Sequence, residues 1–158
     1  MQDFDQKELR TIFGQYPTGV TVITTKDKNG SPVGMTANSF ASVSLSPPLV
    51  LWSVDKMRNT HDVYTQSQHF CVHIVDDSQQ ALSDRFASKK EDRFSEMEWS
   101  EGVLDSPVLS GCLCSIECET EAIYPGGDHS IILGKVVNTN LESSKNPLIF
   151  HKGNYKKL

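Results

Sequence analysis

The sequence predicts a mainly β protein, an antiparallel sheet that closes into a barrel with two or three short helices outside it. Apolar and polar residues alternate with a period of two, in short bursts along most of the chain. Turn residues such as Asn29-Gly30 and Pro125-Gly126-Gly127 stand between the bursts. Because an open sheet leaves unpaired edges, we expect the strands to close on themselves.

The alternation divides the chain into short predicted strands. In chain order they are 20–25, 33–35, 40–46, 49–54, 70–75, 112–124, 131–137 and 148–151. Pro47 and Pro48 end the third strand, because proline has no N–H to donate to a ladder. The fourth is apolar on both faces, which is typical of a central strand. From Cys112 to Tyr124, mainly apolar positions alternate with a serine and three glutamates, which indicates a half-buried sheet.

Two helices are predicted between the strands. Asn59 or Thr60 caps the first, over 61–66, because either side chain can accept a hydrogen bond from a free N–H of the first turn. The polar residues 76–78 cap the second, over 79–87. The stretch that follows, up to residue 110, shows neither a helical nor a strand period.

Composition limits the class of protein. A chain of 158 residues, 37% hydrophobic and without repeat or linker, predicts one domain over residues 1–158. Its net charge of -5 argues against nucleic acid as a partner. The longest uncharged aliphatic-aromatic stretch is Leu49–Trp52, whereas a membrane span needs about 20 apolar residues. Met1–Asp5 lacks the features of a signal peptide, so we expect a cytoplasmic protein with no membrane partner.

Three of the four cysteines, Cys112, Cys114 and Cys118, are close enough in the sequence to suggest a metal site. Structural zinc, however, usually takes closely spaced cysteine pairs that wrap a turn. These three lie along one face of a predicted strand, where buried thiols act as small hydrophobic residues. We therefore expect core cysteines and no metal, with metal or redox chemistry as the alternative.

Three segments carry polar groups that a core does not require. Residues 34–40 combine small side chains, a hydroxyl, an amide and free N–H groups, which suit the edge of a flat ring or simply the polar start of a strand. The loop 56–60 offers two cations at the start of a helix, which suits a phosphate or a solvated basic loop. His129 follows two glycines at a hairpin tip, where its imidazole is either a ligand contact or a surface group.

Several blocks of the chain occur in an order that resembles a known family. They are Pro17–Thr24, Gly34–Phe40 with Ser42–Ser44 and Pro47–Val50 behind it, Phe86-Ala87, Asp92–Phe94, Gly127–His129 with Gly134, and Pro147–Phe150 followed by Gly153 and Tyr155. Together, from about residue 10 to residue 155, they resemble the short-chain flavin reductases, the reductase components of two-component flavin monooxygenases.

The resemblance implies an FMN-binding split β-barrel that forms a homodimer. Such a protein transfers a hydride from NADH or NADPH to FMN, with FAD possible, and supplies reduced flavin to a partner monooxygenase. The flavin itself performs the hydride chemistry, so no catalytic triad is expected. Two alternatives stay open: an FMN-binding electron-transfer or oxidase protein on the same barrel, and a binding module with no redox role.

The resemblance also assigns roles to residues. It implies isoalloxazine contacts from Thr36, Ala37, Asn38, Ser39 and Ser53. It implies a hold on the ribityl phosphate by Lys56, Arg58, Asn59 and Thr60, with Arg85 and Phe86 closing over it. It implies nicotinamide contacts from Asp128 and His129, of which His129 is the catalytic residue. Asn59 departs from the family, which often has serine at that position of the phosphate loop.

Overall fold

A computed structural model describes residues 4–90, 92–142 and 144–158. The prediction for the N-terminal segment Met1–Asp5 therefore falls partly on residues 1–3, which lie outside the described residues. The helices are α1 (Gln6–Phe13), α2 (His61–Gln66) and α3 (Gln80–Ala87). The strands are β1 (Thr18–Gly19), β2 (Thr21–Lys26), β3 (Pro32–Ala37), β4 (Ala41–Leu45), β5 (Pro48–Asp55), β6 (His69–Ile74), β7 (Trp99–Glu101), β8 (Pro107–Leu109), β9 (Cys114–Gly126), β10 (His129–Leu141), β11 (Ile149–His151) and β12 (Asn154–Lys156).

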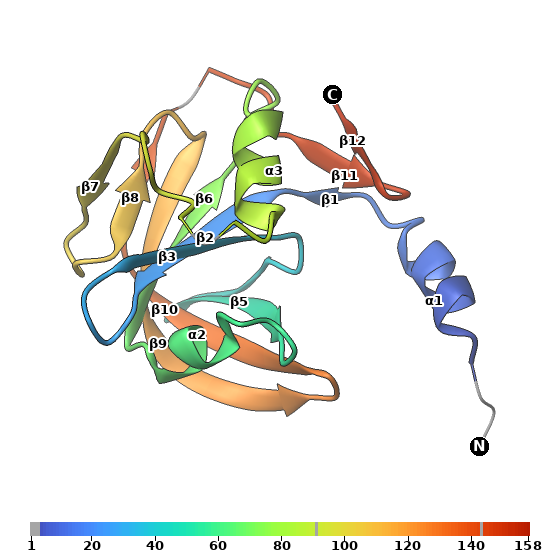
Figure 1. Cartoon of the computed structure of the whole chain (residues 1–158), viewed down its shortest axis with the longest axis horizontal. Coiled ribbons are helices and arrows are strands. Elements are labelled where there is room, and N and C mark those ends of the chain that lie inside the picture. The colour runs from blue at the N-terminus through green and yellow to red at the C-terminus, as the bar shows by residue number, and fades with distance from the viewer. Residues whose placement is uncertain (1–3, 91, 143) are drawn as a thin grey trace.

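Seven antiparallel strands form the main sheet, in the order β3-β2-β6-β9-β10-β5-β4. The sheet coils until β3 contacts β5, and the two strands lie close together in Figure 1. Strands β3 and β4 remain the two edges of the sheet, so the barrel is split between them. The hydroxyl of Ser39 in the β3–β4 connection bridges the split: it accepts from the Ser53 N–H at 2.9 Å and lies 3.1 Å from the Ser53 carbonyl. The predicted mainly β fold with an antiparallel split barrel is confirmed.

Two apolar cores hold the sheet in this shape. Inside the barrel, Trp52 packs edge-to-face against Tyr64 of α2 and Phe70 of β6, with ring centroids 4.9 and 5.9 Å apart. The second core lies beneath α3 and includes Phe86 and Phe94. Strand β5 lies between β10 and the edge strand β4, and is not central as the sequence predicted. Its residues that point into the barrel are buried, and from Leu49 to Asp55 those that point outward are half-buried.

One face of β9 differs from the prediction. Its glutamates were expected on a solvent face, but Glu117 is buried. The β7–β8 hairpin covers it, and its carboxylate accepts hydrogen bonds from the Leu104 N–H at 3.1 Å and the Asn138 amide at 2.9 Å. This hairpin lies in the segment whose sequence showed neither a helical nor a strand period. Contacts with residues distant in the sequence, such as Glu117, hold it in place, so its own sequence need not alternate.

The helix caps also differ from the prediction. Thr60 and Gln79 occupy the N-cap positions of α2 and α3, and neither forms a side-chain cap bond. Asp76 instead accepts from the N–H of Ser78 at 2.7 Å, before α3 begins. In the part of the chain that the structure describes, no helix is long and apolar enough to cross a membrane.

The cysteines follow the core interpretation. Cys71, Cys112 and Cys118 are buried and Cys114 is half-buried, all as free thiols. Burial raises the pKa of Cys112 and of Cys118 to about 12, which keeps both thiols protonated. Among residues 4–90, 92–142 and 144–158 no three potential ligands gather as a metal site would require.

Candidate functional site

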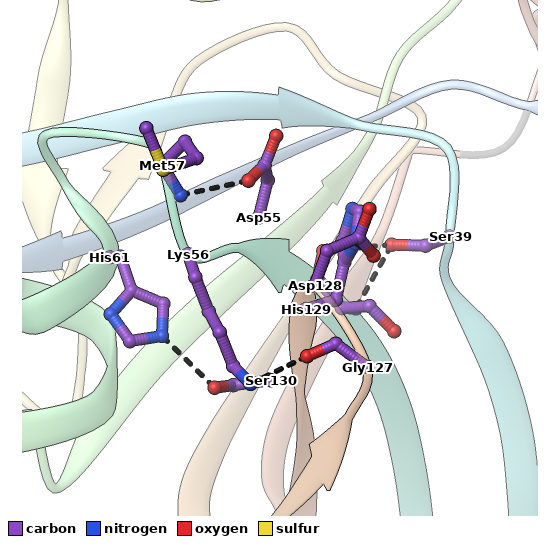
Figure 2. Close-up of polar contacts among 10 residues, drawn as sticks. Ser39, Asp55, Lys56, Met57, His61, Gly127, Asp128, His129 and Ser130 are labelled. Carbon is purple, nitrogen blue, oxygen red and sulfur yellow. Dashed lines mark hydrogen bonds and ion pairs between the residues drawn. The ribbon is translucent and has the colours of Figure 1, made fainter. Parts of the chain in front are cut away.

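The segments that the sequence singled out meet at one end of the split. The register between β5 and β10 places His129 opposite Asp55 and Ser130 opposite Val54. Ser39 reaches the same end of β5 through its bonds to Ser53 (Figure 2). The fold therefore brings together residues from the β3–β4 connection, the end of β5 and the β9–β10 tip.

The β9–β10 tip is tied to the loop that follows β5. Gly127 adopts a positive φ of 69°, which glycine tolerates without strain. Its carbonyl accepts a hydrogen bond from the Lys56 ammonium at 2.6 Å (Figure 2). The Lys56 N–H donates to the Asp128 carbonyl at 3.0 Å. These two bonds fix the position of the tip relative to β5.

His129 presents its imidazole at this tip. The ring is 41% exposed, and its Nδ1 lies 2.7 Å from the carboxylate of Asp128. The hydrogen bond from His129 and its charge lower the pKa of Asp128, so the carboxylate stays ionised and holds the ring. Nδ1 is thereby occupied, which leaves Nε2 to face a ligand.

A slot of about 170 Å³ opens beside β3. Its lining includes Thr36, Ala37 and Asn38 at the end of β3, together with Phe150 and Tyr155 of the C-terminal hairpin, Val20 and Ala87. As an edge strand, β3 offers unpaired main-chain groups here. Apolar walls with polar groups along one edge suit a flat, heteroatom-rich ring.

Two of the predicted ring contacts are already engaged inside the protein. The Thr36 hydroxyl donates to the Ser83 carbonyl of α3 at 2.5 Å, and the Ala37 carbonyl accepts from the Thr21 hydroxyl at 2.6 Å. Asn38 and Ser39 are exposed. The amide of Asn38 and the free backbone of β3 are therefore the groups best placed to meet a ring edge.

The predicted phosphate loop carries exposed cations. Lys56 and Arg58 are exposed, and neither forms an ion pair with the residues that the structure describes. A third cation, Arg93, donates to the Gly34 carbonyl at 2.7 Å and the Ser88 carbonyl at 2.6 Å. Burial lowers the pKa of Arg93, and the charge of Arg58 lowers it further. Cations without carboxylate partners attract an anion such as phosphate.

Both predicted α3 residues of this loop, Phe86 and Arg85, contact the protein interior or main chain in this structure. Phe86 was expected to close over the phosphate, but its side chain is only 1% exposed and packs in the second core against Phe94. Arg85 binds the carbonyls of Arg93 and Ser95 instead of pointing to solvent. Both residues therefore support the site from behind β3.

Three residues near the site escaped the sequence analysis. Arg93 and Tyr155 belong to quoted motifs, but only the fold brings them beside Arg58 and the slot. His61 was interpreted as an ordinary helix residue, yet its Nε2 lies 2.9 Å from the Ser130 hydroxyl (Figure 2). No local pattern signals such contacts between distant segments.

A larger cavity, of about 560 Å³, lies at the other side of α2. Its hydroxyl groups bond to one another or to main chain: Thr25 contacts Ser67 at 2.7 Å and the His69 carbonyl at 2.7 Å. Lys26 and Lys28 line it together with three aspartates, and it has no Phe, Tyr or Trp in its walls, so size alone does not make it the better candidate for a flat ring.

A slot with aromatic residues in its lining, set on a split barrel, suits the flat ring of a flavin and so points to the class of flavin-binding oxidoreductases. The chain belongs to the family of the flavin reductase like domain, whose family model matches residues 13–158.

Named relatives agree with this family. The chain is 40% identical to the reductase subunit HsaB of a flavin-dependent monooxygenase from Rhodococcus jostii, over 96% of this chain and 77% of that protein. It is 39% identical to the FMN reductase (NADH) SmoA of Agrobacterium fabrum, over 94% and 84%. Among solved structures, the NADH:FAD oxidoreductase SgcE6 of Streptomyces globisporus, in complex with NAD and FAD fragments, matches with a TM-score of 0.91 and 36% identity, over 100% and 97% of the two chains.

Proposed function

We propose that this chain is an NAD(P)H:flavin oxidoreductase that supplies reduced flavin to a partner monooxygenase. Family membership and the names of the relatives support the reaction class. The observation that carries the proposal is a chain of contacts: Ser39, next to the slot residue Asn38, bonds to Ser53 near the end of β5, where the Lys56 loop bonds to the β9–β10 tip that carries His129. The reaction requires adjacent binding sites, because the flavin and the nicotinamide nucleotide must lie next to each other for hydride transfer.

The residues divide the work between the two nucleotides. Asn38, Ser39 and the β3 backbone hold the ring edge of FMN or FAD, and Ser53 lies beside them. Lys56 and Arg58 hold the phosphate, with Asn59 and Thr60 in the same loop. The flavin, when bound, supplies the hydride chemistry. The protein supplies orientation, which requires reacting atoms about 3 to 3.5 Å apart.

Asp128 and His129 are assigned to the nicotinamide side of the site. Asp128 fixes the imidazole, and the Lys56 bonds fix the tip that carries it. His129 contacts the nicotinamide nucleotide and places it over the flavin ring. It acts by position and hydrogen bonding, because hydride transfer needs no general base from the protein.

We infer that the chain works as a homodimer. The outward face of the sheet carries an apolar row across four strands: Ala41 of β4, Leu51 of β5, Leu133 of β10 and Ala122 of β9 are register partners. None of the four is fully buried. A contiguous apolar face on a folded chain is typical of a protein interface, and a second copy related by a twofold axis covers it with the same face.

We also place this single-domain enzyme in the cytoplasm. Its four free thiols suit a reducing compartment.

The first experiment follows absorbance at 340 nm with purified protein, NADH or NADPH, and air, with and without added FMN or FAD. We expect oxidation of many equivalents of NAD(P)H that requires free flavin. No turnover with either nucleotide, despite a bound yellow chromophore, would contradict the proposal and favour an electron-transfer or oxidase protein. A colourless, inactive protein whose melting temperature ignores excess flavin would leave a binding module.

Arg58→Ala tests the phosphate assignment. Loss of a charge-assisted bond to phosphate is expected to raise the flavin dissociation constant about ten- to a hundredfold, measured by fluorescence titration. Arg10→Ala, which removes a cation from α1, serves as the matched control and is expected to leave flavin affinity unchanged. Equal affinities of Arg58→Ala and wild type would remove Arg58 from the site.

A further inference from the structure

A contact between α2 and the start of β10 has no role in the reaction as derived above. His61, the first residue of α2, places its Nε2 2.9 Å from the Ser130 hydroxyl (Figure 2). Its Nδ1 lies 2.8 Å from the Asp62 carboxylate. Ser130 directly follows His129. We propose that His61 is a positioning residue, which acts through Ser130 to hold His129 in place for the hydride donor. This inference rests on the proposed function.

The hydrogen bonds of His61 fix its ring. Asp62 is 80% exposed and stays in water, where its carboxylate accepts from Nδ1–H. In the neutral ring Nε2 is then an acceptor, so the Ser130 hydroxyl donates to it. The side chain of His61 is 17% exposed and Ser130 is 8% exposed, so water competes little for this bond.

The strand geometry transmits this bond to His129. Successive side chains on a strand point to opposite faces. Ser130 points inward with the buried Ile132, while His129 points outward at the site. Anchoring Ser130 from inside therefore fixes the backbone from which the His129 ring projects.

The side chains of Ser130, His61 and Asp62 are hydrogen-bonded in the same sequence, serine to histidine to aspartate, as in a hydrolytic triad. The burial of Ser130 nevertheless assigns this group a positioning role. A nucleophile must reach its substrate, and Ser130 lies beneath the sheet surface. His61 also differs from Lys56, which bonds to the tip but belongs to the predicted phosphate loop. His61 can therefore be changed without removing a group that contacts flavin.

Four variants separate the two bonds of His61. An Asn side chain places its amide near Nδ1 and a Gln side chain near Nε2. His61→Asn is therefore expected to keep the Asp62 contact and lose Ser130, whereas His61→Gln keeps the contact with Ser130. Ser130→Ala removes the same bond from the other side. His69→Gln is the control, because this histidine lies on β6 and uses only its main chain in the bonds described.

The first readout is hydrogen–deuterium exchange of the segment 127–131 in the free protein. Loss of one buried hydrogen bond is expected to speed exchange of this segment about three- to tenfold in His61→Asn and Ser130→Ala. His61→Gln and His69→Gln are expected to exchange as wild type does. Unchanged exchange in both His61→Asn and Ser130→Ala would overturn the proposal.

The second readout is steady-state kinetics. The KM for NAD(P)H is expected to rise about three- to tenfold in His61→Asn and Ser130→Ala, with flavin affinity within twofold of wild type. The double variant His61→Asn/Ser130→Ala is expected to raise the KM no further than either single change, since both changes break the same hydrogen bond. An equal loss of flavin affinity, or His61→Gln as impaired as His61→Asn, would overturn positioning by this bond. A wild type inactive with every flavin would instead overturn the proposed function, and the exchange experiment would still decide the contact.

Discussion

His73 shows how one buried side chain can join three strands and make the fold sensitive to pH. The residue is fully buried on β6. Its Nδ1 lies 3.0 Å from the Val22 carbonyl on β2, and its Nε2 accepts from the Leu109 N–H on β8 at 3.0 Å. These partners require the neutral ring with its proton on Nδ1, because a proton on Nε2 would face the Leu109 N–H.

Burial lowers the pKa of His73 from its usual 6.5 to about 4. The unfolded chain therefore binds more protons between these values, so the free energy of unfolding rises with pH. We expect the contribution of His73 to be complete above about pH 6.5 and to be lost as pH falls toward 4, a change on the order of 3 kcal/mol. Urea unfolding at pH 4.5, 5.5, 6.5 and 7.5 measures it.

The histidine variants isolate this pH effect. His73→Gln is expected to be less stable at pH 7.5 and to show a flatter dependence on pH, because the titrating group is gone. His69→Gln, a change on the same strand, is expected to keep the wild-type slope. A slope in His73→Gln as steep as in wild type would assign the pH dependence to another group.

His129 carries the residue-scale prediction for activity. His129→Ala is expected to lower kcat/KM for NAD(P)H about tenfold while flavin affinity stays within twofold, because the ring belongs to the nicotinamide side of the site. Stopped-flow reduction of flavin and fluorescence titration measure the two quantities. Equal losses of both would contradict the division of the site between the phosphate loop and the His129 tip.

At the scale of elements, β3 matters because it is both a wall of the slot and an edge of the barrel. Gly34 lets this strand approach α3 closely: an added Cβ would lie 2.4 Å from an atom of the Phe86 ring. That ring is locked by Phe94, with centroids 5.2 Å apart. The Arg93 guanidinium also binds the Gly34 carbonyl at 2.7 Å, so the position of β3 and that of Arg93 are linked.

Gly34→Ala is therefore expected to destabilise the fold by about 1 to 3 kcal/mol, because the buried Phe86 ring cannot move away. Gly19→Ala is the matched control: it adds the same methyl group on β1, where nothing lies within 4 Å. Urea unfolding of both variants measures the difference. Equal stability of Gly34→Ala and Gly19→Ala would show that the Phe86 ring of α3 can move to accept the added methyl group without loss of stability.

The strands that sequence could predict are those whose own pattern determines their burial. Period-two alternation identified β2, β6 and most of β9, and the Asn29-Gly30 turn identified the β2–β3 hairpin. The β7–β8 hairpin was missed because its partner Glu117 lies in a different strand. Helix α1 was missed as well. Its apolar residues Leu9, Ile12 and Phe13 share one face at helical spacing, but none of the helix residues is buried, so this face has no packing partner among the described residues.

The same reasoning separates the predictable from the unpredictable residues of the site. The Lys56 loop and the His129 tip are each continuous in sequence, and the fold brings them together through the Lys56 bonds. Arg93, Tyr155 and His61 enter through tertiary contacts alone. The Phe86-Ala87 motif indicates that Phe86 matters but does not show that its side chain faces the core, as it does in this structure.

At the scale of the whole molecule, the site and the apolar sheet face are neighbours. Ser53 points to the same outward face as Leu51, two residues away on β5, and Ile131 lies opposite Ser53 on β10. A second copy seated on this face would therefore cover the apolar row and also stand beside the flavin slot. Dimerisation would then exclude water from the site as well as bury the face.

Leu133→Arg tests this arrangement. Leu133 lies in the middle of the apolar row, between Leu51 and Ala122, so an arginine there places two charges against each other across a twofold interface. Sedimentation velocity is expected to show wild type at twice the monomer mass and the variant as a monomer, with near-wild-type circular dichroism because the side chain points away from the barrel interior. Val103→Arg, at a position 66% exposed between β7 and β8, is expected to remain dimeric. A monomeric wild type, or a Leu133→Arg variant that stays dimeric, would show that this face is not the interface, and the apolar row would then need another partner.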